Sequence, residues 1–72
     1  MFDVYNGIKI KMSKNDLNIP HVEATYGNYK GIFSIKTGKI ISGNLPSQQV
    51  MDIEYWVVIN EEKLMSRWNV LS

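Results

Sequence analysis

The sequence predicts one small α+β domain: a four-stranded antiparallel β-meander followed by one or two C-terminal helices packed on one face. Apolar and polar residues alternate in separate segments between residues 7 and 43, which is the period of half-buried strands. Beyond Pro46, apolar residues recur at helical spacing instead. A chain of 72 residues has room for a single core, so we expect residues 1–72 to form one domain.

The alternating segments define the predicted strands. They are residues 7–13, 21–26, 29–36 and 39–43. A polar loop closed by Pro20 separates the first two. Gly27 tolerates the positive φ of a type II′ turn between the second and third, and Thr37-Gly38 predicts another tight turn before the fourth.

Helix signals occupy the rest of the chain. Pro46 suits a first helical turn, and the apolar residues after it follow no strict alternation. Asn60, with two glutamates after it, is typical of a new helix start, where its amide oxygen would accept backbone N–H groups. A second apolar stripe follows, formed by Leu64, Trp68 and Leu71. We expect one helix bent near Asn60, or two helices in succession.

Composition excludes several classes of protein. A hydrophobic fraction of 44% with 21% charged residues is too apolar for intrinsic disorder. Cysteine is absent, so disulfides and thiolate metal ligands are excluded. No signal peptide or membrane-spanning run is visible, and we expect a cytoplasmic protein without membrane contact. A core of this size is marginal, which makes association with a partner protein, or a homo-oligomer, physically useful.

Few residues of this sequence are candidates for catalysis, and the first of them is the one histidine. His21 could serve as a general acid or base, and Glu23 lies two residues on, on the same strand face. Asp16, in the loop before this strand, is the third candidate. The alternative is that His21 only hydrogen-bonds locally at the entry to a strand. Two ligands without a third make a poor metal site, so we expect neither a metal nor a cofactor.

A second candidate site is the solvent face of the predicted sheet. If the alternation holds, one set of side chains shares that face: Lys9, Lys11, His21, Thr25, Lys30, Ser34 and Lys36. The lysines among them, Lys9, Lys11, Lys30 and Lys36, could follow the phosphate backbone of RNA or DNA. No aromatic residue is interleaved with them to stack on bases, so a simply solvated face is the alternative.

A third candidate is the apolar run Tyr55 to Ile59, whose residues cover every direction around a helix axis. One side of this helix would pack on the sheet, and its other apolar side chains would have to be buried by another part of the chain or by another protein. We predict a partner interface made of Tyr55, Trp56, Val58 and Ile59. The alternative is coverage by the second apolar stripe of the same chain.

The order and spacing of several motifs resemble a bacterial family, the "domain of unknown function 4160". They are Tyr5-x-Gly-Ile-x-Ile-x-Met12, Asp16-x-Asn-x-Pro-His-x-x-Ala-x-Tyr-Gly27, Gly43-Asn-Leu-Pro46, Trp56, Leu64 and Trp68. The resemblance implies a compact α+β domain, often encoded beside a second small protein and regarded as a component of toxin-antitoxin type modules. No reaction is implied.

The family typically carries a histidine-rich stretch that this chain keeps only in part. Asp16, Pro20, His21 and Ala24 match that stretch, and two of its three histidines are missing. By position, the resemblance directs functional interest to His21 and Asp16 alone.

Three functions follow as hypotheses from these observations. The first is a protein-interaction component of a two-gene toxin-antitoxin type module, whose partner is a small protein encoded by a neighbouring gene. The second is a ribonuclease-like enzyme that uses His21. The third is a nucleic-acid-binding module that uses the lysine-rich sheet face.

Overall fold

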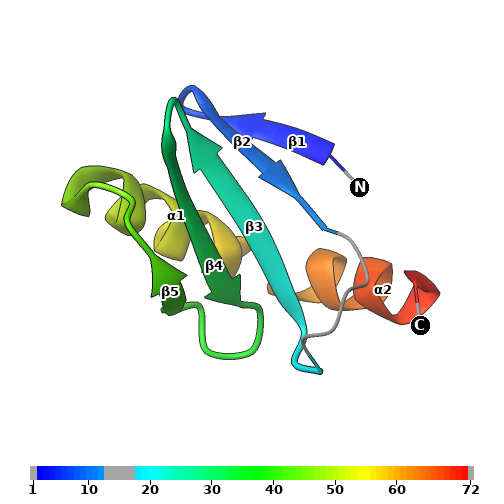
Figure 1. The fold of residues 1–72 in the computed structure, drawn as a ribbon. Helices are drawn as coiled ribbons and strands as arrows, with labels where there is room; N and C mark the ends of the chain where they lie inside the picture. The colour runs from blue at the N-terminus through cyan, green and yellow to red at the C-terminus, as the bar shows by residue number, and fades with distance from the viewer. Residues whose placement is uncertain (1, 13–17, 72) are drawn as a thin grey trace.

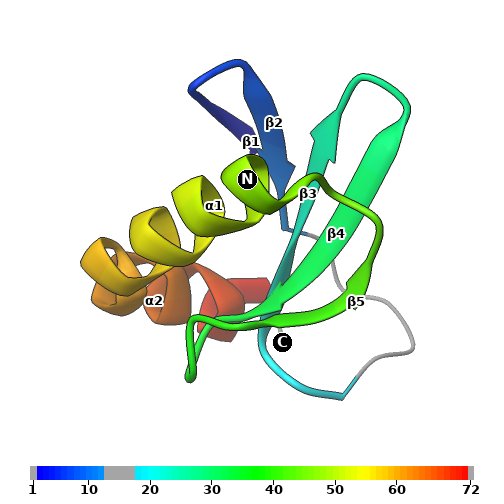
Figure 2. The ribbon, with the colours of Figure 1, turned by 90° about the vertical axis from the view of Figure 1, so that its left-hand side faces the viewer.

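The fold is an antiparallel β-sheet with two helices on one side of it. The computed structural model describes residues 2–12 and 18–71. Its elements are β1 (Phe2–Tyr5), β2 (Ile8–Lys11), β3 (His21–Tyr26), β4 (Tyr29–Ser34), β5 (Ile40–Gly43), α1 (Ser47–Ile59) and α2 (Glu61–Leu71). The five strands follow the order β1-β2-β3-β4-β5, and every neighbouring pair is antiparallel (Figure 1). Figure 2 shows both helices on the same side of this sheet.

The predicted number of strands is wrong by one, because β1 adds an edge strand to the expected meander. Its residues pair with β2 from Phe2↔Lys11 to Tyr5↔Ile8. The connecting turn is Asn6-Gly7, with φ of 51° and 76°. Positive φ at both central residues matches the twist of a two-residue hairpin, and Asn-Gly is the strongest local signal for such a turn. This dipeptide is the sequence signal for β1.

The predicted turn at Gly27 and the helix break agree with the structure. The β3–β4 hairpin closes between Tyr26 and Tyr29, with Gly27 at φ 59°. The predicted tight turn at Thr37-Gly38 is wrong, because β4 ends at Ser34 and β5 begins at Ile40, and residues 35–39 form a longer connection closed by the hydrogen bond from Ser34 N–H to Lys39 O.

The role of Asn60 also differs from the prediction. Asn60 separates the two helices, but its side chain does not cap the second helix as expected. Its Nδ2 donates a 2.8 Å hydrogen bond to the carbonyl oxygen of Trp56. Asn60 therefore closes the end of α1, and its backbone carbonyl accepts from Leu64.

The core lies between the inner face of the sheet and the two helices. The buried apolar residues are Ile8, Ile10, Met12, Val22, Ala24, Phe33, Ile35, Leu45, Ile53, Trp56, Val57, Leu64 and Trp68. The strand members alternate with polar residues, as predicted. The predicted second stripe contributes only Leu64 and Trp68, because Leu71 lies in the last turn of α2 and is exposed.

The passage from β5 into α1 depends on Gly43. Its φ of 126° is unfavourable for other residues, and an added Cβ would lie 2.3 Å from the carbonyl oxygen of Lys30. Asn44 then bonds the backbone of Lys30 twice, because its Oδ1 accepts from Lys30 N–H and its N–H donates to Lys30 O. Leu45 is buried beside Gly31. This connection sets where α1 starts.

Candidate functional site

One face of α1 presents large apolar side chains to solvent. Met51, Tyr55, Val58 and Ile59 are 63%, 60%, 60% and 57% exposed; we call these four residues the α1 stripe. They follow at spacings of four, three and one, which places them on one side of a helix. Ile53, Trp56 and Val57 are the buried residues of α1. The chain therefore leaves the α1 stripe uncovered, and the alternative of coverage by its own second apolar stripe is wrong.

Trp56 is a correction to the predicted partner interface. Its side chain is 7% exposed, and its ring centroid lies 6.5 Å from that of Tyr5. Trp56 therefore packs on the core side of α1, whereas Tyr55, Val58 and Ile59 face solvent. Met51 was missed in the sequence; its position four residues before Tyr55 was the available signal.

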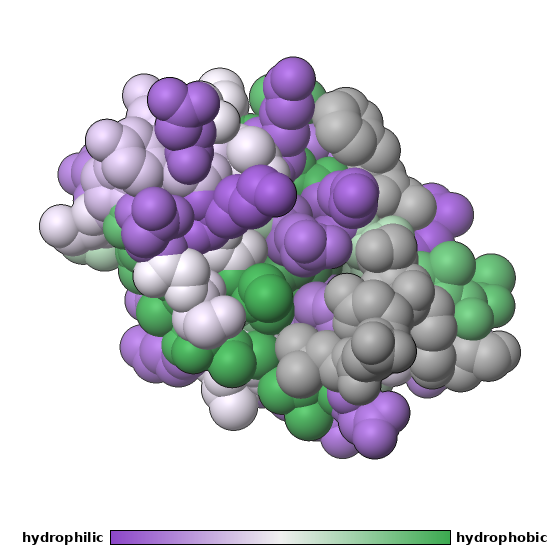
Figure 3. Space-filling view, in the orientation of Figure 1, coloured by the Kyte–Doolittle hydropathy of each residue, from purple (hydrophilic) through white to green (hydrophobic). Residues whose placement is uncertain are grey.

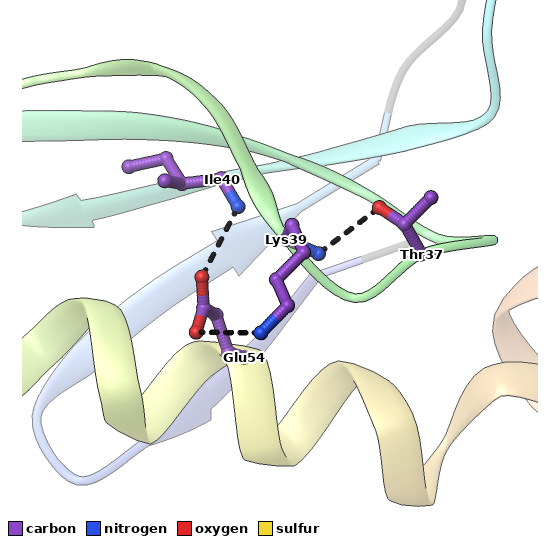
Figure 4. Close-up of polar contacts among 4 residues, drawn as sticks. All are labelled: Thr37, Lys39, Ile40 and Glu54. Atoms are coloured by element: carbon purple, nitrogen blue, oxygen red, sulfur yellow. Dashed lines mark hydrogen bonds and ion pairs between the residues drawn. The ribbon is translucent and has the colours of Figure 1, made fainter.

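A shallow hollow runs along one side of the α1 stripe. It is lined by Thr37, Gly38, Lys39, Met51, Glu54, Tyr55 and Val58. Glu54 holds the turn before β5 against the helix, because one carboxylate oxygen accepts from Ile40 N–H at 3.3 Å and the other lies 3.9 Å from Lys39 Nζ (Figure 4). Thr37 Oγ1 accepts from Lys39 N–H at 3.2 Å. The turn and the helix thus form one continuous surface.

Carboxylates lie beside both ends of the α1 stripe. Beyond Ile59, a second hollow is lined by Val58, Ile59, Asn60, Glu61, Glu62 and Lys63. Its two carboxylates belong to the first turn of α2. At the other end, the first turn of α1 has no acidic residue, and Pro46 supplies no side-chain cap. Asp52, directly after Met51, accepts a 3.0 Å hydrogen bond from Gln48 Nε2 and places a carboxylate at this end as well.

His21 is buried rather than aligned with the lysines, which corrects its predicted place on the solvent face. It is 1% exposed, and its ring meets that of Trp68 in α2 edge-on, with centroids 5.2 Å apart. Its Nδ1 lies 2.8 Å from the carbonyl oxygen of Ile19. Because a carbonyl can only accept, Nδ1 carries the proton in this contact. The local hydrogen bond expected as the alternative is therefore present.

Of the other two residues of the predicted catalytic set, the structure describes only Glu23. Asp16 lies outside the described residues. Glu23 is half-buried on the outer sheet face, paired in register with Lys11 on one side and Ile32 on the other. Across residues 2–12 and 18–71, no group of three or more histidine, cysteine or acidic side chains is placed to hold a metal ion.

Three of the four predicted lysines, Lys9, Lys11 and Lys30, share the outer face of the sheet, whereas Lys36 does not lie on a strand. The register aligns Lys9 with Thr25 and Thr25 with Lys30, and Lys11 occupies the same face two residues after Lys9. Lys36 is exposed in the turn after β4. Figure 3 shows hydrophilic side chains across the middle of this face and a hydrophobic area over β4 and β5. The face is basic but mixed, since Glu23 lies among the lysines.

The sequence matches a known family. The model described as "Domain of unknown function (DUF4160)" matches residues 7–69. The chain belongs to the DUF4160 family. Neither the curated proteins nor the solved structures gave a match. The DUF4160 description assigns no activity, and in the described part of this domain no helix is long and apolar enough to cross a membrane.

The structure gives several residues of the DUF4160 motifs a structural role. Gly43 and Asn44 join β5 to α1, and Trp56, Leu64 and Trp68 fill the core. The α1 stripe contains none of the motif residues that supported the family resemblance.

Proposed function

We propose that this DUF4160 domain works by binding a partner protein, as the interaction component of a two-gene toxin-antitoxin type module. The observation that carries this proposal is the α1 stripe, four adjoining large apolar side chains that are each more than half exposed. Monomeric proteins expose such contiguous patches mainly where they bind other molecules. Methionine and tyrosine are also enriched at protein interfaces.

The proposed partner is a small protein encoded by a neighbouring gene. The family resemblance supports this choice, because members are often encoded beside a second small protein. Binding also has a physical advantage, since a ligand that binds only the folded state stabilises a marginal domain. A core of this size supplies only about 3 to 5 kcal/mol by itself.

Co-expression with the neighbouring gene product tests the proposal. The two proteins should co-purify, and Tyr55→Asp should abolish the complex because it places a charge in the centre of the α1 stripe. Tyr29→Asp is the matched control: Tyr29 is also an exposed tyrosine, but it lies in the β3–β4 hairpin. Thermal denaturation must show that both variants remain folded. Retention of the complex by Tyr55→Asp contradicts the proposed surface.

A growth assay tests the toxin-antitoxin component of the proposal. Expression of this chain alone should slow bacterial growth, and co-expression of the neighbouring protein should restore it. If growth is unaffected and no neighbouring gene product co-purifies, the proposal fails.

A second candidate function, nucleic-acid binding, is favoured by one observation. Lys9, Lys11 and Lys30 lie together on the solvent-exposed sheet face. Phosphate contacts release counterions, so affinity for a single-stranded RNA should fall steeply with salt. Lys9→Gln with Lys30→Gln should weaken binding and flatten that dependence. Binding that is insensitive to salt argues against this function.

A further inference from the structure

The two outer strands of the sheet turn some of their backbone groups away from their neighbours. These strands are β1 and β5 (Figure 1). Successive residues of an antiparallel strand point their N–H and C=O groups alternately toward the neighbouring strand and away from it. Tyr5 and Ile8 flank the two-residue Asn6-Gly7 turn and close the hairpin as its hydrogen-bonded pair. Phe2 and Val4 therefore point their backbone groups outward, and such a row is a template for another strand.

A carboxylate binds the outward N–H group of Val4 in β1. Asp3 Oδ1 accepts a hydrogen bond of 2.8 Å from Val4 N–H, and the Asp3 side chain is exposed. Hydrogen bonds to a charged acceptor are roughly twice as strong as those between neutral groups. A carbonyl group of an incoming strand would have to displace this carboxylate. Strand addition at β1 therefore breaks a stronger hydrogen bond than the one it forms at Val4.

The other edge of the sheet has the same arrangement, and its carboxylate comes from α1. Ser34 N–H donates to Lys39 O at 2.9 Å, so the next residue, Ile40, points its N–H away from β4. Glu54 Oε2 accepts from Ile40 N–H at 3.3 Å (Figure 4). β5 also pairs with β4 through an irregular register. Irregular edges pair poorly with other strands, so β1 is the edge that depends more on its carboxylate.

We propose that Asp3 and Glu54 close the two sheet edges against strand addition, and that the strand kept off β1 is β1 of a second copy of this chain. A two-fold axis at Asp3 would join Val4 of each copy to Phe2 of the other in an antiparallel pair. This register uses the outward groups of both residues. It also sets the two Asp3 side chains directly opposite each other, where like charges are destabilising. The α1 stripe takes no part in this pair, so the pair is independent of the proposed partner complex.

Analytical ultracentrifugation of Asp3→Ala tests the closure of β1. Over a roughly hundredfold range of concentration, the wild-type chain should stay near 8.3 kDa, whereas Asp3→Ala should approach twice that mass. Glu62→Ala removes an exposed carboxylate from α2 instead of from a sheet edge, and should behave as the wild-type chain. A wild-type chain that dimerises as strongly as Asp3→Ala, or an Asp3→Ala chain that stays monomeric, overturns the proposal.

Amide hydrogen exchange tests the two hydrogen bonds within the monomer. In dilute Asp3→Ala, Val4 N–H should exchange at least roughly tenfold faster than in the wild-type chain, because it has lost its acceptor. Ile40 N–H should respond in the same way to Glu54→Ala and should not respond to Asp3→Ala, so each variant is the control for the other. Thermal denaturation must show that both variants are folded. Unchanged exchange at Val4 in Asp3→Ala, or at Ile40 in Glu54→Ala, removes that carboxylate from the proposal.

Cross-linking through Asp3→Cys tests the register of the β1 pair, since the chain has no native cysteine. This substitution removes the carboxylate and places two thiols directly opposite each other, at a non-hydrogen-bonded pair whose Cα atoms lie about 4.5 Å apart. Oxidised glutathione should therefore link Asp3→Cys chains to one another. Asn28→Cys, in the β3–β4 hairpin, is the control and should link little. Equal linking of the two variants overturns the β1 pair.

Discussion

Replacing His21 by alanine should destabilise the domain, because the structure gives this histidine a packing role. The variant loses an edge-on contact with Trp68, and such aromatic pairs contribute about 0.5 to 1.5 kcal/mol beyond burial. It also loses the hydrogen bond to the carbonyl oxygen of Ile19, and such a bond contributes about 0.5 to 1.5 kcal/mol to stability. The sum is about 1 to 3 kcal/mol, a large part of the stability of so small a domain.

Thermal unfolding followed by circular dichroism measures this effect. For a domain of this size, each kcal/mol shifts the midpoint by about 4 to 8 °C, so His21→Ala should lower Tm by at least about 4 °C. His21→Phe keeps an aromatic ring beside Trp68 but no donor for Ile19, and should recover part of the loss. A Tm unchanged in His21→Ala would refute the packing role. It would also return His21 to consideration as a general acid or base.

Three other predictions concern the scaffold. Gly43→Ala should lower Tm by more than about 8 °C, because its Cβ would collide with the carbonyl of Lys30 and its φ is unfavourable for alanine. Glu54→Ala removes the acceptor for Ile40 N–H and should cost about 0.5 to 1.5 kcal/mol in urea unfolding, with little dependence on salt because the 3.9 Å ion pair with the exposed Lys39 side chain contributes little to this loss. Trp56→Ala should cost about 3 to 5 kcal/mol and leave the chain largely unfolded at room temperature, whereas Met51→Ala on the opposite face should change stability by less than about 0.5 kcal/mol. Equal effects of these last two substitutions on urea unfolding would contradict the assigned faces of α1.

Local signals in the sequence were sufficient for most of the elements. The alternation in residues 7–13 and 21–36 predicted strands whose lysines share one face, and the register agrees for Lys9, Lys11 and Lys30. The break at Asn60 followed from residue types alone, because the two helices end and begin there. Such features depend on neighbours a few residues apart. Patterns in the local sequence therefore predict such features well.

The edge strand β1 and the role of Asn60 were harder to predict from the sequence. β1 has four residues and gains its conformation mainly from pairing with β2, so its own pattern is too short to be distinctive. The side chain of Asn60 can donate as well as accept, and only the position of the Trp56 carbonyl decided which it does.

The sequence by itself determined the strands of the meander, the helical layer and the apolar character of Tyr55 to Ile59. Only the tertiary structure decided that Trp56 turns toward the core while Tyr55, Val58 and Ile59 meet solvent, and that His21 lies against Trp68 instead of beside the lysines. The physical reason is that five apolar residues in succession carry no period, and a residue at the end of a strand is free of the alternation. At both positions, packing against segments that are distant in the sequence decides which way the side chain points.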